Sequence, residues 1–265
     1  IELPDALLLT GNVRVSHDGI IMTCNKAYYY QKENYIKAFG DVEMIQGDTL
    51  TMTSKYAEYN GNMRKAFATG NAKMRSPEST LVTDTINLDR NTQEVFYNTD
   101  GTITNRDNIL KSKSGKYYVA EKKFQFLTAV TITNPKYVMK SNHLDYYSNS
   151  GHFLRKSYIK YDDRIIEGDS LYYDRNREFA SATRNVKIKD SVNRGIIKGH
   201  YAELYKNKDS MFVTKRAVAV NFVDNDSVYI HGKKMMVTGP EGNRIIRAFK
   251  NVRFYKTDMS GKCDS

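Results

Sequence analysis

The sequence predicts an all-β protein, an elongated, open antiparallel β-jelly roll built from about nine tandem repeats of roughly 30 residues. Three observations support this fold class. A strand-like phrase returns roughly every 27 to 34 residues, apolar and polar residues alternate within it, and turns rich in glycine and asparagine separate the copies. Alternation with a period of two is the mark of a half-buried strand, and such turns join neighbouring strands.

The first repeated phrase is a small or polar residue, most often glycine or asparagine, followed by alternating apolar residues. Its nine copies begin at residues 11, 40, 70, 101, 129, 157, 185, 217 and 251. Gly11-Asn12-Val13-Arg14-Val15 is a typical copy, with valine on one face and arginine on the other. A repeat of this kind indicates units that stack on their neighbours, because one unit cannot bury its apolar face alone.

Two further phrases complete each repeat. A tyrosine-rich phrase follows some 15 residues later, as in Tyr56-Ala57-Glu58-Tyr59, and polar turn residues such as Asn60-Gly61-Asn62 come after it. The chain then returns through a small residue beside an aromatic one, as in Ala66-Phe67. With 20 tyrosines in the chain, this composition is typical of strands. Each repeat therefore supplies about two strands.

Stacked repeats of this type predict two walls of about nine strands each, which face each other and enclose the apolar residues. A parallel β-solenoid satisfies the same periodicity, but the tight Asn-Gly turns favour antiparallel pairing. We expect residues 1–265 to form a single continuous repeat domain. Residues 262–265 match the start of a repeat phrase seen at residues 168–171, so we also expect the repeats to continue beyond a truncated C-terminus.

The charge of the chain favours anionic partners. Lys and Arg total 41 against 30 Asp and Glu, which gives a net charge of +11. The basic residues are scattered along the strands, so charge alone identifies no ligand. No apolar stretch is long enough for a transmembrane helix, and residues 1–11 lack the basic start of a signal peptide. We expect any export signal to be absent from this sequence.

The sequence contains no recognisable catalytic constellation. Its five histidines are dispersed, and the two cysteines, Cys24 and Cys263, lack metal-ligand spacing. Cys24 lies in a strand-like run and is expected to be a buried thiol, while the Asp162-Asp163 pair is expected in a turn. We therefore predict no enzyme activity, no catalytic residues, no cofactor and no metal site.

The order of these phrases resembles the OstA/LptA family over nearly the whole chain. The motifs are a G-x-V-x-[VIM] strand, a G-D-[ST]-L strand, a tyrosine-rich turn and an alanine-containing return, with the best copies at residues 37–67 and 154–180. The resemblance implies a periplasmic protein of Gram-negative type that carries lipopolysaccharide toward the outer membrane. It also implies a V-shaped cross-section with acyl chains between the walls. Terminal strands would join it to further copies or to like-folded domains of the inner- and outer-membrane machinery.

Alternation identifies the candidate lipid-facing residues of the interior. They are Val13, Val15, Val42, Met44, Leu50, Met52, Val130, Ile132, Val186, Ile188, Val218, Val220, Val252 and Phe254. The alternative function is a structural or adhesive β-repeat protein that binds surface polysaccharide, with a filled interior. A nucleic-acid binder is disfavoured, because no motif of that class occurs and the basic residues are spread along alternate strand positions.

Overall fold

A computed structural model describes residues 5–17, 19–47, 50–147, 150–161, 163–174, 176–223, 226–240 and 242–265. Nearly all of these residues lie in β-strands, together with one 3-10 turn, η1 (Lys206–Lys208). Every strand pair with a described register is antiparallel, for example β1 with β2 and β14 with β15. The antiparallel all-β prediction is confirmed, and a parallel solenoid is excluded. Among the described residues, no helix is long and apolar enough to cross a membrane.

The chain divides into two compact units, residues 1–132 and residues 133–265. Among the residues that the structure describes, eleven strands begin in the first unit: β1 (Ala6–His17), β2 (Ile20–Tyr30), β3 (Tyr35–Gln46), β4 (Leu50–Asn60), β5 (Lys65–Arg75), β6 (Thr80–Asp89), β7 (Glu94–Tyr97), β8 (Gly101–Asn105), β9 (Asn108–Ser112), β10 (Ser114–Tyr118) and β11 (Lys123–Asn134). The prediction of a single continuous domain over residues 1–265 stays a prediction.

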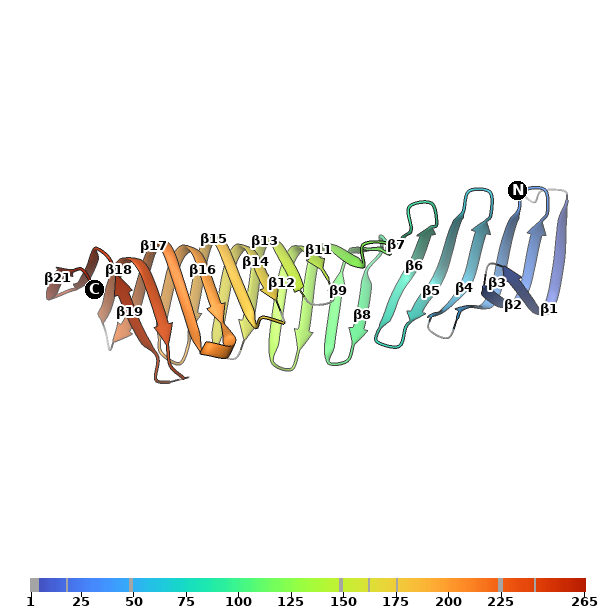
Figure 1. The fold of residues 1–265 in the computed structure, drawn as a ribbon. Coiled ribbons are helices and arrows are strands. Elements are labelled where there is room, and N and C mark those ends of the chain that lie inside the picture. The colour runs from blue at the N-terminus through green and yellow to red at the C-terminus, as the bar shows by residue number, and fades with distance from the viewer. Residues whose placement is uncertain are drawn as a thin grey trace. The chain divides into compact units, whose positions relative to one another are not determined.

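In the described part of the second unit, ten strands begin: β12 (Tyr137–Tyr146), β13 (Ser150–Tyr161), β14 (Arg164–Asp174), β15 (Phe179–Asp190), β16 (Gly195–Tyr205), β17 (Ser210–Val223), β18 (Asp226–Thr238), β19 (Ile245–Phe249), β20 (Val252–Lys256) and β21 (Met259–Cys263). Within each unit the strands run side by side in chain order (Figure 1). Asp163 lies in the turn before β14, as expected, whereas Asp162 lies outside the described residues.

A bulge divides each long strand into two halves. In β1 the pairing with β2 jumps from Thr10 to Val13, and two residues of β1 are skipped against one residue of β2. The same jump recurs in β3, β5, β13, β15 and β17, each time with two residues skipped. Apart from Asn12, the residues skipped in these odd-numbered strands have positive φ, as in Gly40 at 73° and Asp41 at 46°. Bulges of this kind bend and twist a strand, so the strand turns a corner at this point.

The corner gives each unit two walls that face each other. We define wall A as the half-strands before the bulge of an odd-numbered strand, together with their partners; residues 6–10 of β1 and 26–30 of β2 are an example. Wall B is the other half, such as residues 13–17 and 20–24. In the first unit, Ala27 and Ala38 of wall A share one buried cluster with Val13 and Val42 of wall B.

The nine-repeat prediction is confirmed in its count, since the described strands form nine two-strand passes through both walls. Three single crossings of the walls are each split into two short strands near the corner: β7 with β8, β9 with β10, and β19 with β20. The expected number of strands in each wall was too low. Each long strand bends at its bulge and enters both walls, so one repeat contributes two half-strands to each wall instead of one.

Candidate functional site: the interior between the walls

The interior of the first unit is packed by residues of complementary size. A row of small side chains crosses wall A, and Ala27, Ala38 and Ala57 are fully buried there. The opposing row in wall B runs through Met22, Met44 and Met52 to Met74, and each of these is paired with the next across the sheet. Long, flexible methionines fill the space that alanines leave, so this interior is apolar and adaptable.

The middle of the second unit is also filled. Ile159, Ile166 and Ile188 of wall B lie opposite Leu171, Ala182 and Ala202 of wall A, around a gap of about 20 Å³. A gap of that size holds no more than about one water molecule. These residues therefore form a packed core in the observed conformation.

The interior widens at β18, β19 and β20. A cavity of about 490 Å³ lies here, within the roughly 300–1,000 Å³ typical of pockets for small ligands. The lining residues are mostly apolar: Val228, Ile230, Ile246, Arg247, Ala248, Phe249, Val252, Phe254 and Ser265. Ile230 pairs with Phe254 in wall B, and Ile246 and Ala248 belong to wall A. The cavity is thus an opening between the two walls.

Arg244 joins the free rims of the two walls in the second unit. It lies at the rim of wall A, directly before β19, and its Nη1 donates to Asp163 Oδ2 at 2.9 Å. The same nitrogen contacts a carboxylate oxygen of Asp190. Asp163 and Asp190 both lie at the rim of wall B, and the side chains of Arg244 and Asp163 are each 8% exposed. This buried ion-pair group closes the mouth between the walls, and we call it the Arg244 latch.

Electrostatics within the latch favour its charged form. Burial alone would lower the pKa of Arg244, but the two carboxylates raise it above its ordinary value. Burial would raise the pKa of Asp190, but hydrogen bonds from Asn193 and Arg244 lower it. The neighbouring Arg164 has a lowered pKa, because it is buried and lies close to Arg244.

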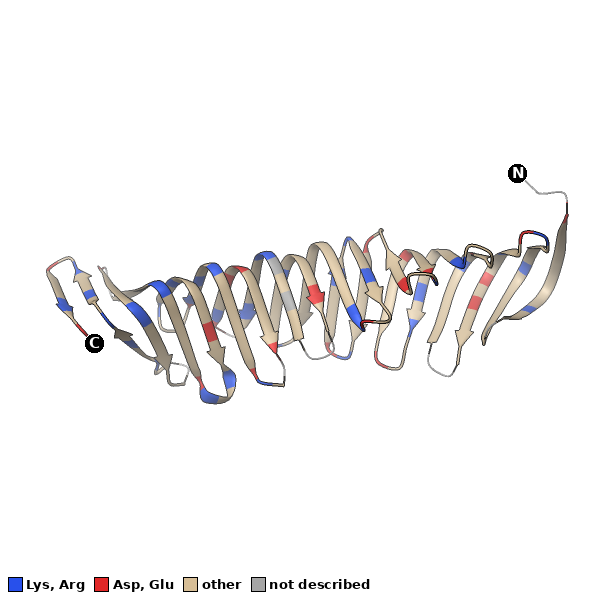
Figure 2. Cartoon of the chain, turned by 45° about the horizontal axis from the view of Figure 1, so that its top comes forward, with Lys and Arg blue, Asp and Glu red and all other residues tan. Residues whose placement is uncertain are grey.

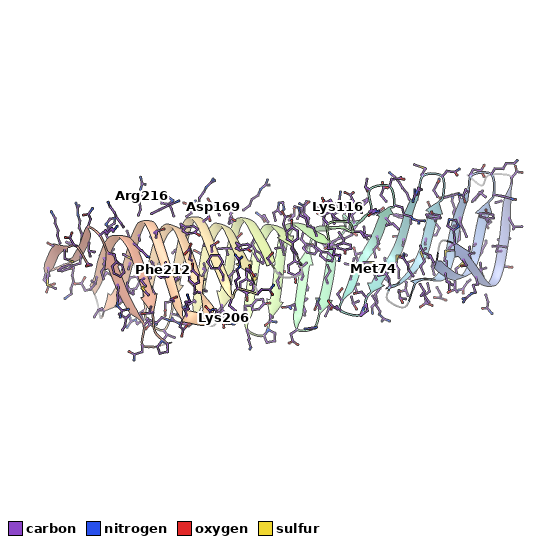
Figure 3. All side chains as sticks on the ribbon, in the orientation of Figure 1. Met74, Lys116, Asp169, Lys206, Phe212 and Arg216 are labelled. Carbon is purple, nitrogen blue, oxygen red and sulfur yellow. The ribbon has the colours of Figure 1, made fainter. Side chains whose placement is uncertain are left out.

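A second contact crosses the same mouth. The ammonium of Lys206, in η1 at the rim of wall A, lies 5.6 Å from the ring centroid of Tyr161 at the rim of wall B. In Figure 3, Lys206 lies on the edge of this unit opposite to Asp169 and Arg216, which belong to the corner. The mouth is therefore bridged at two places between β13 and β19.

The structure places twelve of the predicted lipid-facing residues on the inner side of the walls. They are Val13, Val15, Val42, Met44, Leu50, Met52, Val130, Ile132, Val186, Ile188, Val252 and Phe254. Only Val252 and Phe254 line the 490 Å³ cavity, while Ile188 belongs to the packed middle of the second unit. Lipid contact at these twelve positions stays a prediction.

The predicted interior positions Val218 and Val220 are wrong. Ala217 and Ala219 are buried at 0% and 1% exposure, so the valines between and after them face outward. The bulge at Lys215 and Arg216 determines which residues of β17 face inward. The residue directly after each bulge faces inward, and here that residue is Ala217. Alternating Ala and Val are apolar on both faces, so the sequence pattern alone did not reveal which face was buried.

Several residues of the site were not predicted from sequence. Val228, Ile230 and Ile246 line the cavity but lie outside the repeated phrases that identified the candidates. Their alternation with polar or exposed neighbours, as in Tyr229-Ile230-His231, is the signal that identifies them. For the Arg244 latch no sequence signal exists, because its partners lie 81 and 54 residues away.

Cys24 is buried, as expected, and both cysteines are free thiols. Burial raises the pKa of the Cys24 thiol, which makes it less reactive. Across the part of the chain that the structure describes, no group of three or more His, Cys, Asp or Glu side chains is arranged to hold a metal ion.

Comparisons with known proteins give a family and nine matching chains from solved structures. No curated protein matches the sequence. LptH of Pseudomonas aeruginosa, described as the LptA-homologous periplasmic component of a lipopolysaccharide transport device, is a structural match with a TM-score of 0.24. Its sequence identity is 11%, over 48% of this chain and 74% of LptH. Similarity at this level does not transfer a function.

The family comparison covers more of the chain. The profile of the OstA-like proteins matches residues 2–142, just over half of the 265 residues. This stretch contains nearly all of the first unit, with its alanine and methionine rows. The chain therefore belongs to the family of OstA-like proteins.

Proposed function

We propose that this protein binds lipopolysaccharide and carries it across the periplasm toward the outer membrane, without enzymatic activity. The observation that carries the proposal is the 490 Å³ apolar cavity between the walls at β18 to β20. Membership of the OstA-like family supports it, because the family resemblance in the sequence implies the same ligand. Each methylene of an acyl chain buried there contributes about 0.8 kcal/mol, so one chain of ordinary length is held firmly.

Transfer along such a protein is passive. An acyl chain in the cavity meets a packed core between β13 and β17, where only about 20 Å³ is free. For the chain to pass, the two walls have to separate, and the Arg244 latch and the Lys206–Tyr161 contact resist this movement. The protein thus holds lipid where the walls are apart and admits it further only when the mouth opens.

A bridge requires docking edges, and we propose that β1 and β21 provide them. Among the described residues, β1 pairs with β2 and β21 pairs with β20, and no other register is described for either strand. An unpaired strand edge is a template for adding another strand. We infer that like-folded domains of the membrane machinery, or further copies of this chain, continue the sheet at these edges.

The test is lipopolysaccharide binding to purified protein with a matched pair of variants. Ile230→Asp places a charge in the cavity, whereas Tyr229→Asp places it on the outer face of the same strand, where Tyr229 is 46% exposed. We expect Ile230→Asp to weaken binding at least about tenfold, because a charge in an apolar site is costly, and Tyr229→Asp to bind as the unchanged protein does. Equal binding by both variants, with circular dichroism showing both folded, would falsify the cavity as the lipid site.

A further inference from the structure

The corner of the second unit carries a row of cations. The residues skipped at the bulges of β13, β15, β17 and β18, and the pair between β19 and β20, supply it. We call these cations the basic ridge: Arg155, Lys156, Arg184, Lys215, Arg216, Lys233 and Lys250. All seven are exposed, and Figure 2 shows blue segments at successive bends of this edge.

The backbone at these positions disfavours such residues. Arg155, Lys156, Arg184, Lys215, Arg216 and Lys250 have φ between 57° and 65°, the left-handed region that glycine and asparagine adopt most easily. Two equivalent bulges of the first unit contain Gly40-Asp41 and Gly70-Asn71, and β11 has Thr128-Ala129 at positive φ. Long basic side chains at strained positions reduce stability and are a signature of functional constraint. Folding alone therefore does not explain why arginine and lysine occupy this row.

The uneven distribution of charge along the chain also indicates a functional role for the ridge. Residues 133–265 hold 25 of the 41 Lys and Arg and 15 of the 30 Asp and Glu, a net charge of +10, which leaves +1 for residues 1–132. In the first unit the charges at the corner balance, because Lys55 and Lys113 lie there together with Asp41 and Asp84. The excess charge of the protein is thus a property of the second unit.

The ridge cations lie apart from the carboxylates that the structure describes. Within the described ranges, no carboxylate lies within ion-pair distance of any of the seven. The one acidic residue in the row, Asp169, accepts hydrogen bonds from Asn185 Nδ2 at 3.0 and 3.1 Å. Bulges on alternate strands lie about 10 Å apart, close to the screening length of about 8 Å at physiological salt. Their fields therefore overlap along the row.

The shape of the ridge favours one kind of anionic partner, a flat surface, over a flexible polyanion. It lies on the outside of a bend, with Val186 and Ala217 buried directly beneath it, and Arg216 in Figure 3 points away from the ribbon. A convex row of exposed cations is accessible to a flat anionic surface. A flexible polyanion is instead held in a groove and on exposed aromatic rings, whereas the ridge is convex and the ring contact described for its cations is that of Lys215 with Tyr201, at 5.8 Å.

We propose that the basic ridge docks the second unit on an anionic phospholipid surface, with the mouth between the walls turned away from that surface. The proposal goes beyond lipid carriage, because the ridge lies on the opposite edge of the unit from the Arg244 latch. Lys187 and Lys198, paired across β15 and β16 on the outer side of wall B, extend the cationic area beside the ridge. Each basic residue close to an anionic leaflet strengthens binding about fivefold.

The test uses sedimentation with vesicles of phosphatidylcholine, with or without phosphatidylglycerol, at low and high salt. The ridge variant changes five residues to asparagine: Arg155, Arg184, Lys215, Arg216 and Lys250. The control variant removes the same number of exposed cations elsewhere by changes to glutamine: Lys111, Lys122, Lys136, Lys160 and Arg177. Asparagine suits the left-handed backbone, so the ridge variant is expected to unfold at the same temperature as the unchanged protein or higher.

We expect the unchanged protein and the control variant to bind vesicles that contain phosphatidylglycerol, and salt to weaken this binding. The ridge variant should bind at least about 100-fold more weakly. An equal loss in the control variant would show that net charge, and not the ridge, is responsible, and would overturn the proposal. Binding of the ridge to dextran sulfate without any binding to anionic vesicles would overturn it in favour of a polyanion.

Discussion

Arg244 connects parts of the chain that no local pattern brings together. Its guanidinium is almost fully buried between Asp163 and Asp190, and its Nε donates no hydrogen bond to any described atom. An arginine kept in such a place is expensive to desolvate. We infer that Arg244 occupies this position because its ion pairs connect the two walls across the mouth of the second unit.

Arg244→Met is expected to destabilise the protein by about 3–5 kcal/mol, because it removes the ion-pair partner of two poorly exposed carboxylates. Urea unfolding at neutral pH measures the change. Arg177→Met is the control, since Arg177 is 82% exposed and its ion pair with Asp174 contributes no more than about 1 kcal/mol. A loss for Arg244→Met no larger than for Arg177→Met would contradict the role of the latch.

The latch also makes stability depend on pH. Since the pKa of Asp190 in the folded protein is below its ordinary value of 3.8, its stabilising contribution is complete above that value and disappears as the pH falls through the folded pKa. Acid should therefore destabilise the unchanged protein more steeply than Arg244→Met. Parallel acid dependence of the two proteins would show that Asp190 does not respond to Arg244.

At the scale of elements, the repeats could be predicted from sequence because each strand has its own alternation of apolar and polar residues. Val13, Val42 and Val186 follow a bulge that contains glycine or asparagine, so their inward orientation was predicted. The copy at residues 217–220 follows Lys215-Arg216, a bulge without glycine or asparagine, and the prediction of which of its residues face inward was wrong. The corner itself was not predicted, because the sequence does not reveal which residues a strand pair skips.

The corrected phase of β17 gives a direct prediction. Ala219→Asp buries a charge at a position that is 1% exposed, so we expect a loss of several kcal/mol or failure to fold. Val220→Asp places the same charge on the outer face and should change stability by less than about 1 kcal/mol. Thermal unfolding of the two variants shows which of the two residues faces inward. A larger loss of stability for Val220→Asp than for Ala219→Asp would show that Val220 faces inward, as the sequence had predicted.

At the scale of the whole molecule, composition predicted the class of protein but not where its features lie. A net charge of +11 indicated an anionic partner, yet the excess is concentrated in residues 133–265 and its exposed row lies on the corner of that unit. Likewise, alternation indicated an apolar interior, but only the packing of side chains shows a filled core around Leu171 and an open cavity beside Phe254. Patterns give the face on which a residue lies, whereas free volume depends on all its neighbours.

The central claim is that lipopolysaccharide lies between the walls at β18 to β20, and site-specific photo-crosslinking tests it most directly. A photoreactive residue at Phe254 points into the cavity, and one at Tyr255, the next residue and 57% exposed, points outward. We expect crosslinks to lipopolysaccharide at Phe254 and none at Tyr255. Crosslinks at Tyr255 alone, or at neither position in a folded protein incubated with the lipid, would contradict the account.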